Sequence, residues 1–335
     1  MARDQRPHLL SRRSFCGTLA GVLVAPGIAI GQASRIRRIG VLEPGAPASP
    51  ERLRMLAEPL RELGWVEGEN LHVEYRYDNG RPEQLQLLAE ELVRAKVEII
   101  VTAGTPATLA AMHATDTIPI VFGYSGDPLL GGLVATLARP GGNVTGYSAA
   151  QPEVRAKSLS VLKELLPSAR RIGVLWGADQ PRIFRAQFEH TCQSLGLEPI
   201  IIETNDNEAG DADRLIAQLM RQRAEALFME SGIDWDWDKL AEAFEIATKY
   251  RLPTMGEENE TVIRCGALIA YTTTLAEAVR RRAEYIDRIL RGAKPADLPV
   301  QQPTKFELAI NLKTAKALGL TIPQSLLARA DKVIQ

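Results

Sequence analysis

Side chains that could carry out catalysis are sparse in this sequence of 335 residues. There is no GxGxxG after the first predicted strand, and no GxxxxGKS/T, HExxH or GxSxG signature. The segment GYSGDP, around Ser125, is one residue out of register for a nucleophile elbow. Beyond residue 33 the histidines are His72, His113 and His190, which are better explained as solvated or core residues. We therefore expect no catalytic residues and no cofactor.

An acidic run imitates a calcium-binding loop. Its acids match positions one, three, five, nine and twelve of the loop template: Asp234, Asp236, Asp238, Glu242 and Glu245. Lys239 stands at the sixth position, where the template needs glycine. Apolar residues at 240, 243, 244 and 247 have helical spacing, so this segment is predicted to be a helix capped by Asp236 or Asp238. No metal site is expected.

Residues suited to binding a ligand stand where predicted strands end. Ligands of open parallel sheets bind outside the carboxyl ends of the strands. In the first half these ends are residues 43–49, 104–108 and 123–128, and in the second half they are 176–181, 231–235 and 256–260. The candidate ligand-binding residues are Glu43, Gly104, Thr105, Pro106, Ala107, Tyr124, Ser125, Asp127, Trp176, Asp179, Ser231, Gly232, Glu257 and Glu258.

Different members of this set suit different parts of a ligand. Thr105 as N-cap and Pro106 at the first helical position predict a helix start, whose amides and dipole favour a carboxylate. Asp127 could cap another helix or accept a hydrogen bond from a ligand. Tyr124 and Trp176 could sandwich a flat or apolar group. An ammonium could pair with one of the acids, each of which is also compatible with a solvated surface position: Glu43, Asp179, Glu257 and Glu258.

The elements that must position these residues alternate strand and helix in two similar halves. Strand-like runs are separated by helical stretches such as residues 51–63 and 82–95, which indicates βαβ units around parallel sheets. RRIGVL at 37–42 recurs at 170–175, Leu-Gly at 63–64 recurs at 195–196, and Ile118-Pro119 is echoed by Leu252-Pro253. The fold class is therefore α/β, with two similar Rossmann-like lobes, each a parallel sheet flanked by helices, joined by a hinge of several segments.

The segment ARPGGNVTG at 138–146 is interpreted as a crossing between the lobes. It follows the amphipathic run GGLVATLA, predicted to be a helix ended by Pro140, and precedes another predicted helix. Its glycines could absorb a hinge motion, although an ordinary helix-to-strand loop would use similar residues. The expected lobes are 34–146 plus about 275–297, and 147–274 plus about 298–335. A long helix is predicted at 275–291 and a final helix at 323–333.

The first 33 residues differ in kind from the rest. SRRSF at 11–15 matches the twin-arginine export pattern, and a short apolar run follows it. We expect a cleaved leader at 1–33 and a periplasmic protein; the alternative is an uncleaved membrane anchor. A net charge of −1 with no Lys/Arg block argues against nucleic acid as a partner. Cys192 and Cys265 could pair or be buried thiols. We expect a monomer.

The long string IPIVFGYSGDPLLGGLVATLARPGGNVTG, with GTPAT at 104–108 and LGLTIPQSLLARADKVI at the end, resembles ABC transporter substrate-binding proteins, including tryptophan/tyrosine-type binders. The resemblance spans residues 36–334. It implies a type I periplasmic-binding fold with three crossing segments, and capture of a small solute for a membrane ABC permease. It also implies that the solute contacts 104–107 and 125–127, and faces the loops after Leu175, Met229 and Met255.

Two departures from that family lie in the expected cleft: GYSG at 123–126 and Trp176-Gly177. The solute's identity is therefore not carried over; an aromatic or branched amino acid, or another small carboxylate, is the expected class. Hinge closure on the solute would exclude water and create the form that the permease recognises. The alternatives are a ligand sensor for a membrane receptor and an exported α/β enzyme.

Overall fold

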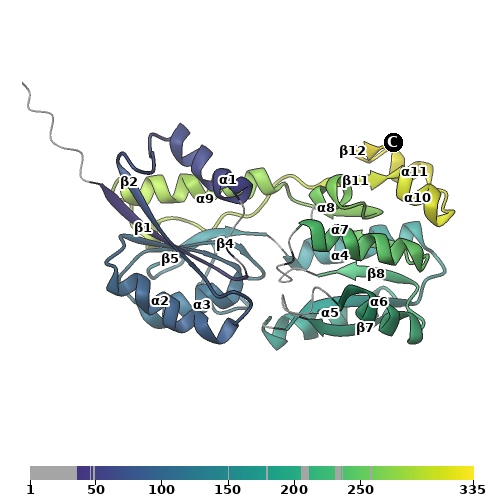
Figure 1. Cartoon of the computed structure of the whole chain (residues 1–335). Coiled ribbons are helices and arrows are strands. Elements are labelled where there is room, and N and C mark those ends of the chain that lie inside the picture. The colour runs from purple at the N-terminus through teal and green to yellow at the C-terminus, as the bar shows by residue number, and fades with distance from the viewer. Residues whose placement is uncertain are drawn as a thin grey trace, which may run out of the picture. The chain divides into compact units, whose positions relative to one another are not determined.

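The computed structural model describes residues 36–45, 47, 50–149, 151–178, 180–204, 211–230, 235, 237–256 and 259–335, without the side chains of residues 51, 52, 124, 151 and 275. In these ranges the chain forms two sheets, each with helices packed on both faces (Figure 1). The same ranges contain no helix that is both long and apolar enough to span a bilayer.

The first sheet is parallel and has the strand order β2-β1-β3-β4-β5. Successive side chains of a strand point to opposite faces, so Val41 and Leu42 contribute to different cores. Helices α1 (Pro50–Glu62) and α9 (Leu275–Leu290) cover one face, and α2 (Leu85–Arg94) and α3 (Gly104–Ala114) cover the other. The strands are β1 (Arg37–Glu43), β2 (Leu71–Tyr77), β3 (Ile99–Ala103), β4 (Ile120–Ser125) and β5 (Val144–Ser148), and the 3-10 turn η1 (Pro82–Gln84) precedes α2.

The second sheet has the order β12-β11-β10-β9-β8-β6-β7. Its strands are β6 (Arg171–Gly177), β7 (Glu198–Thr204), β8 (Ala226–Met229), β9 (Thr254–Gly256), β10 (Ile269–Thr272), β11 (Glu307–Asn311) and β12 (Lys332–Ile334). Strands β10 and β11 pair antiparallel, whereas the other neighbours are parallel. One face carries α4 (Gln151–Leu165), α5 (Arg182–Ser194), α10 (Leu312–Leu318) and α11 (Gln324–Leu327). The other carries α6 (Ala212–Arg221), α7 (Trp237–Lys249) and α8 (Asn259–Arg264).

The repeat seen in the letters of the sequence is a repeat of topology. Reading β7-β6-β8-β9-β10 beside β2-β1-β3-β4-β5 gives the same connectivity in both sheets. The shared RRIGVL motif lies in β1 and β6. Its glycine is required by the packing of a helix in both copies. A Cβ atom at Gly40 would lie 2.8 Å from Leu92 of α2, and one at Gly173 would lie 2.8 Å from Leu219 of α6. Each glycine lets a helix approach its sheet closely.

The segment interpreted as the crossing has a different structure from the one predicted. Residues 128–142 form turns and bends instead of the helix predicted for GGLVATLA. β5 comes next, and the helix predicted after the segment is α4, which begins at Gln151. The apolar residues Leu133 and Val134 are buried because the chain folds back, with both amides donating to the carbonyl of Pro128 (2.9 and 3.2 Å). The apolar residues with helical spacing in GGLVATLA therefore belong to a loop that packs on the core.

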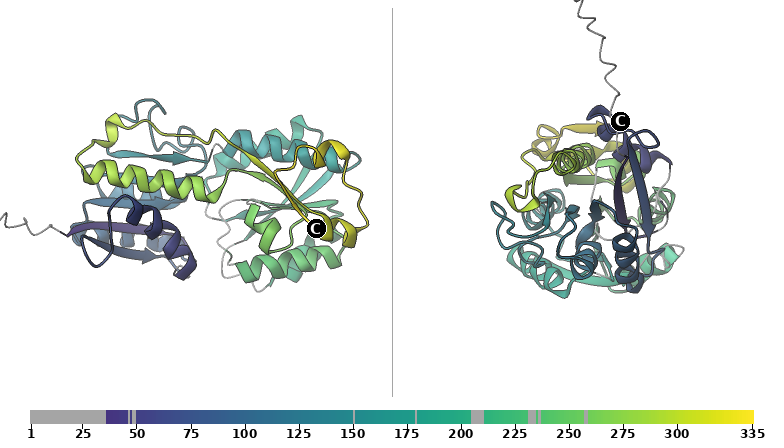
Figure 2. Two further views of the ribbon diagram at one scale, coloured as in Figure 1. Left: turned by 90° about the horizontal axis from the view of Figure 1, so that it is seen from above. Right: turned by 90° about the vertical axis from the view of Figure 1, so that its left-hand side faces the viewer.

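The chain passes from the first sheet to the second after β5, later than the glycines. β5 pairs with β4 as far as Ser148, two residues beyond the boundary expected at 146. Beside it, Gln301 donates to the carbonyl of Gly146 (3.1 Å) and accepts from the amide of Ser148 (2.9 Å) on its way to β11. A third connection runs from β10 into α9 (Figure 2). Residues 138–143 thus lead into β5, the last strand of the first sheet, and residues 144–146 belong to that strand.

The end of the chain also differs from its predicted form. The helix expected at 323–333 is one turn, α11, and the short 3-10 turn η3 (Pro295–Asp297) lies after α9. Lys332, Val333 and Ile334 form β12, which pairs in parallel with β11 at the edge of the second sheet. The edge of β11 offers backbone hydrogen bonds to these residues. Tertiary pairing therefore overrides the local helical pattern.

The remaining motifs have structural roles where they are described. Leu240, Ala243, Phe244 and Ala247 form the buried face of α7, as predicted, and Asp238 is its second residue; Asp234 and Asp236 lie outside the described residues. Among the described residues, no group of three His, Cys, Asp or Glu side chains could hold a metal ion. Cys192 and Cys265 are buried thiols and do not form a disulfide.

Candidate functional site

Two buried hydroxyls lie at the carboxyl ends of neighbouring strands of the first sheet. Thr105 follows β3 and is 1% exposed, and Ser125 ends β4 and is fully buried. Neither hydroxyl makes a hydrogen bond within the described part of the chain. A buried polar group without a partner costs about 1–3 kcal/mol, which makes these two hydroxyls candidates for hydrogen bonding to a ligand.

Thr105 does not have the predicted capping role. Helix α3 begins at Gly104 and its N-cap is Ala103, which places Thr105 inside the first turn. The predicted cap would have used the hydroxyl to satisfy a backbone amide, whereas here the hydroxyl is left available. The first-turn backbone of α3, where Pro106 and Ala107 lie, still presents a positive helix end beside it.

Asp127 and Glu43 already have partners in the protein. Oδ1 of Asp127 accepts from the amides of Leu129 (2.9 Å) and Leu130 (3.0 Å), so it caps the turn after β4. Oε1 of Glu43 pairs with Nη1 of Arg282 on α9 at 3.2 Å. The Arg282 side chain lies across Gly123, where a Cβ atom would be 3.1 Å from its Cδ. Glu43 is thus neutralised by an arginine that sequence reasoning missed.

At the carboxyl edge of the second sheet, Trp176 supports a buried ion pair. Its ring is 2% exposed and packs on Phe188, with centroids 5.6 Å apart. The Arg155 guanidinium lies over the same ring, 5.6 Å from its centroid. Nε of Arg155 donates to Oε1 of Glu230 at 2.9 Å, and Nη2 donates to the same oxygen. Trp176 therefore contacts protein groups, and the predicted ligand sandwich with Tyr124, whose side chain is not described, stays a prediction.

Phe184 of α5 touches the first-sheet side of the site. A Cβ atom at Gly131 would lie 3.2 Å from Cζ of Phe184 and 3.2 Å from Cγ2 of Thr105. At Gly126 a Cβ atom would lie 3.3 Å from Cε2 of the same ring. Phe184 is fully buried and belongs to the core cluster of Trp176 and Phe188. An aromatic ring anchored in the second sheet's core thus fits a glycine-lined surface next to Thr105.

The structure does not describe the remaining residues of the predicted set. Five residues lie outside the described ranges: Asp179, Ser231, Gly232, Glu257 and Glu258. Four residues of the candidate site were not predicted: Arg155, Phe184, Glu230 and Arg282. Only Glu230 carried a usable signal, because it directly follows the strand β8. The other three come from helices, to which a rule based on strand ends does not apply.

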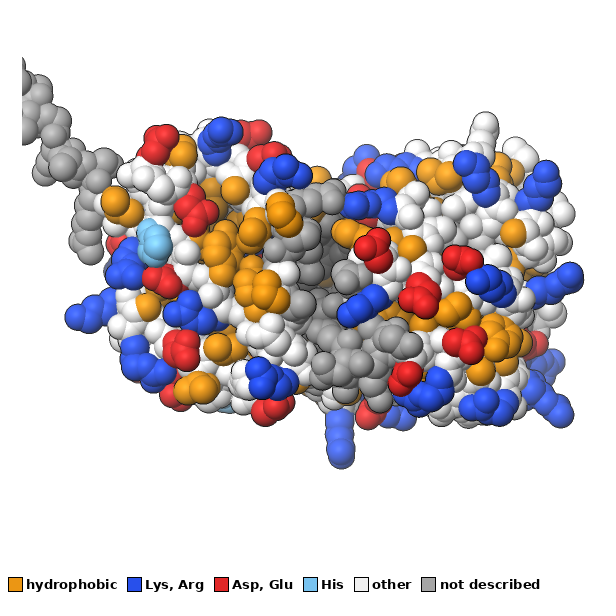
Figure 3. All heavy atoms as spheres, in the orientation of Figure 1, with side chains coloured by type: hydrophobic (Ala, Val, Ile, Leu, Met, Phe, Trp, Pro, Cys, Tyr) orange, Lys and Arg blue, Asp and Glu red, His pale blue; other side chains and the backbone are white. Residues whose placement is uncertain are grey.

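An apolar pocket lies elsewhere, between α1 and β2. Its lining residues include Leu56, Leu60, Trp65, Val73 and Tyr75. Hydrophobic side chains gather on this face of the molecule in Figure 3. The pocket contains none of the polar groups described above, so it is separate from the candidate site.

Comparison with known proteins gives consistent results for family and fold. Residues 45–334 match the family described as ABC transporter substrate binding protein. A tyrosine-binding protein of Clostridioides difficile is 24% identical over 276 residues, covering 82% of this chain and 78% of that protein. Both match most of the chain.

Solved structures share the architecture. A conserved domain protein from Vibrio cholerae is 26% identical, with a TM-score of 0.77 over 89% of this chain and all of that one. A Streptococcus pneumonia ABC domain in complex with L-Trp is 23% identical, with a TM-score of 0.76 over 89% of this chain and 99% of that one. The expected α/β fold of the type I periplasmic-binding class is confirmed.

Proposed function

Because this chain belongs to the family of ABC transporter substrate-binding proteins, we propose that it is the extracytoplasmic receptor of an ABC importer. Proteins of this family bind small molecules and deliver them to ABC permeases; they are not enzymes. The proposed solute is a small carboxylate-bearing molecule, aromatic or amino-acid-like. The tyrosine-binding relative and the L-Trp complex support that class.

One observation carries the proposal: the buried hydroxyls of Thr105 and Ser125, without protein partners, beside the first turn of α3. Hydroxyls and helix-start amides together donate hydrogen bonds to a carboxylate. The solute's carboxylate would replace the interactions that these hydroxyls lack. Of the acids considered for an ammonium partner, Glu43 is paired with Arg282, which leaves Asp179, Glu257 and Glu258 as the proposed partners.

The lobes are proposed to close on the solute as a hinge. The connections after β5, after β10 and before β11 are the segments that would bend. The closeness of Phe184 to Gly126 and Gly131 supports this proposal, because an apolar contact between the two lobes would be lost if they moved apart. The receptor is further proposed to be an exported, periplasmic monomer that does not bind nucleic acid.

A thermal-shift panel tests the solute class. We expect at least one of L-tryptophan, L-tyrosine and L-leucine to stabilise the purified protein, whereas tryptamine and tyramine, which lack the carboxylate, do not. A ligand at 100 times its Kd adds about 2.7 kcal/mol to the free energy of unfolding.

The Thr105→Val variant makes the test specific to the site. It should reduce the ligand-induced shift while leaving the ligand-free Tm unchanged or higher, because the lost hydroxyl had no protein partner. Thr321→Val, at an exposed position near the chain end, is the matched control and should respond like the wild type. A panel without any stabilising carboxylate, or full responses in both Thr105→Val and Ser125→Ala, would contradict the proposal.

A further inference from the structure

Arg155 is a buried cation at the carboxyl edge of the second sheet. It lies near the start of α4 and is 4% exposed. Its two neighbours mark that edge: Trp176 is near the end of β6, and Glu230 directly follows β8. Open parallel sheets bind their ligands at this edge. Burying a guanidinium is costly unless its donors are satisfied, so the use of each nitrogen matters.

Three contacts hold the guanidinium in one orientation. Nε and Nη2 both donate to Oε1 of Glu230, the first at 2.9 Å. The Trp176 ring supports one face of the group. Nη1 makes no hydrogen bond within the described part of the chain, and it is buried. A planar, pre-oriented fork with one free end is suited to recognising a carboxylate.

A comparison with Arg282 of the first lobe shows why Arg155 is the better candidate. Both arginines come from helices that follow a crossing between the sheets, and both pair with a glutamate. Arg282 donates to Glu43 from Nη1. Its Nε has no hydrogen-bond acceptor in the described part of the chain and lies close to Gly123 of β4. Arg155 donates to Glu230 from Nε and Nη2. The nitrogen without an acceptor is therefore the terminal Nη1, which carries two N–H groups.

We propose that Arg155 is the group of the second lobe that binds the solute's carboxylate, by donating a hydrogen bond from Nη1. This inference rests on the proposed function and deepens it. Glu230 and Trp176 act as positioning residues, because they fix the guanidinium plane. Glu230 also neutralises the arginine, so the interaction with a carboxylate is directional hydrogen bonding at a site with no net charge from the pair.

The test compares an acid with its own amide. Isothermal titration calorimetry measures wild type and Arg155→Met with whichever of L-tryptophan, L-tyrosine or L-leucine binds, and with the corresponding amino-acid amide. We expect Arg155→Met to bind the acid about 10- to 100-fold more weakly, the range for a hydrogen bond to a charged group. Binding of the amide should change little, so the preference for the acid is lost.

Two further variants exclude trivial explanations. Arg155→Met leaves Glu230 without its arginine, so the double variant Arg155→Met/Glu230→Gln removes both charges and should lose the same preference while keeping a cooperative thermal transition. Arg38→Met is the matched control: Arg38 lies at the start of β1, at the opposite edge of a sheet, and pairs with Glu74. It should retain the wild-type preference.

The outcomes separate this inference from the proposed function. If an acid binds the wild type and both Arg155 variants keep its preference over the amide, Arg155 does not hold the carboxylate, although the receptor function stands. If no acid of the panel binds the wild type, the proposed solute class fails and this inference fails with it.

Discussion

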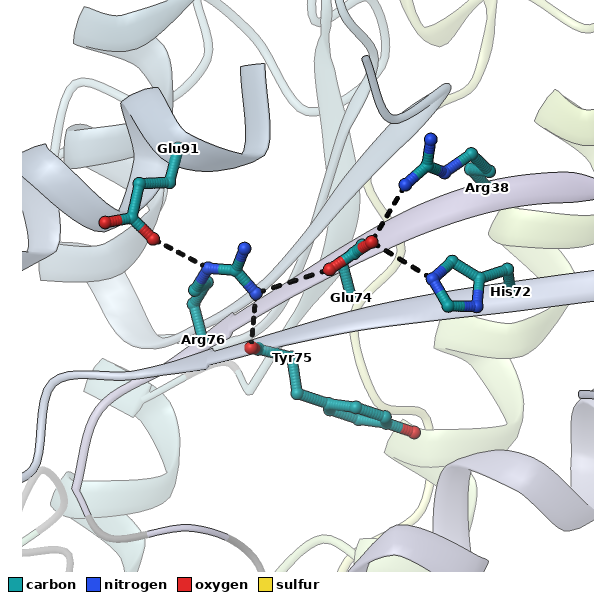
Figure 4. A network of polar contacts seen from close by, with 6 residues as sticks. All are labelled: Arg38, His72, Glu74, Tyr75, Arg76 and Glu91. Atoms are coloured by element: carbon teal, nitrogen blue, oxygen red, sulfur yellow. Dashed lines mark hydrogen bonds and ion pairs between the residues drawn. The ribbon is translucent and has the colours of Figure 1, made fainter. Parts of the chain in front are cut away.

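At the scale of single residues, Glu74 joins three basic side chains on β1 and β2 (Figure 4). Its Oε1 lies 2.9 Å from Nη2 of Arg38 and 3.0 Å from Nε2 of His72, and its Oε2 lies 3.4 Å from Nη1 of Arg76. Arg76 also pairs with Glu91 on α2 at 2.9 Å. The hydrogen bonds from His72 and Arg38 lower the pKa of Glu74.

Replacing Glu74 with Gln should destabilise the protein in a pH-dependent way. A carboxylate whose pKa is lowered by folding stabilises the fold above its unfolded pKa, and that stability is lost as the pH falls through the folded pKa. We expect Glu74→Gln to lower the free energy of unfolding by less than about 1 kcal/mol at pH 7, because the network is partly exposed. Urea unfolding at pH 7 and near pH 3 measures this.

The matched control for Glu74 is Glu69→Gln, an exposed glutamate in the turn before β2. It should have a smaller effect at pH 7. The difference between wild type and Glu74→Gln should shrink on acidification; a difference that stays constant or grows would show that the carboxylate charge is not what stabilises the network.

At the scale of elements, α5 contributes to two interfaces through two phenylalanines. Phe188 packs between Trp176 and Phe228 inside the second-sheet core, with ring centroids 5.6 and 5.5 Å away. Phe184, one turn earlier, contacts the surface of Gly126 and Gly131 beside Thr105. Phe188 therefore stabilises its own lobe, whereas Phe184 also lies against the other lobe.

Phe184→Ala should weaken ligand-induced closure. We expect about a tenfold loss of affinity for the acid that binds the wild type, because the buried ring contributes about 1.5–3 kcal/mol and part of that is gained only on closing. Small-angle scattering with and without the ligand should show a smaller compaction than in the wild type. Phe188→Ala is the control: it should lower Tm but keep the wild-type compaction. Equal compaction in both variants would remove Phe184 from the closing mechanism.

At the scale of the whole molecule, the chain repeats one βα topology in two lobes, and two later segments cross between them. Helix α9 leaves the second sheet to pack on the first, and β11 returns to the second. At the carboxyl end of each sheet a strand-end glutamate pairs with an arginine from the helix that follows a crossing: Glu43 with Arg282, and Glu230 with Arg155. The N-terminal leader lies outside the described residues and is proposed from sequence alone.

The export proposal is tested by Arg12→Lys/Arg13→Lys in a bacterium with twin-arginine machinery. We expect the precursor to accumulate in the cytoplasm, because the pathway reads the arginine pair itself and lysine keeps only its charge. Immunoblots of cell fractions measure the mature and precursor forms. Arg3→Lys/Arg6→Lys makes the same charge-conserving change outside the motif and should be exported normally. Periplasmic mature protein from the first variant would exclude this route.

The hydrophobic periodicity and the repeated letters were sufficient to predict the lobes. The repeat of RRIGVL placed β1 and β6 correctly, and the helices expected at 51–63 and 82–95 agree closely with α1 and with η1 and α2. These strands and helices depend mainly on residues that are neighbours along the chain. Local sequence patterns are therefore enough to predict them. The same local patterns place Thr105 and Ser125 at strand ends, and their role in binding stays a prediction.

Long-range contacts determined the rest. The run GGLVATLA has helical spacing but folds as a loop on the core, and residues 332–334 form a strand because the edge of β11 is available to them. Arg155, Phe184 and Arg282 reach the site from helices that are distant in sequence from the residues they contact. No local pattern encodes which buried donor keeps a free N–H, because that depends on which partners the folded chain brings within hydrogen-bond distance.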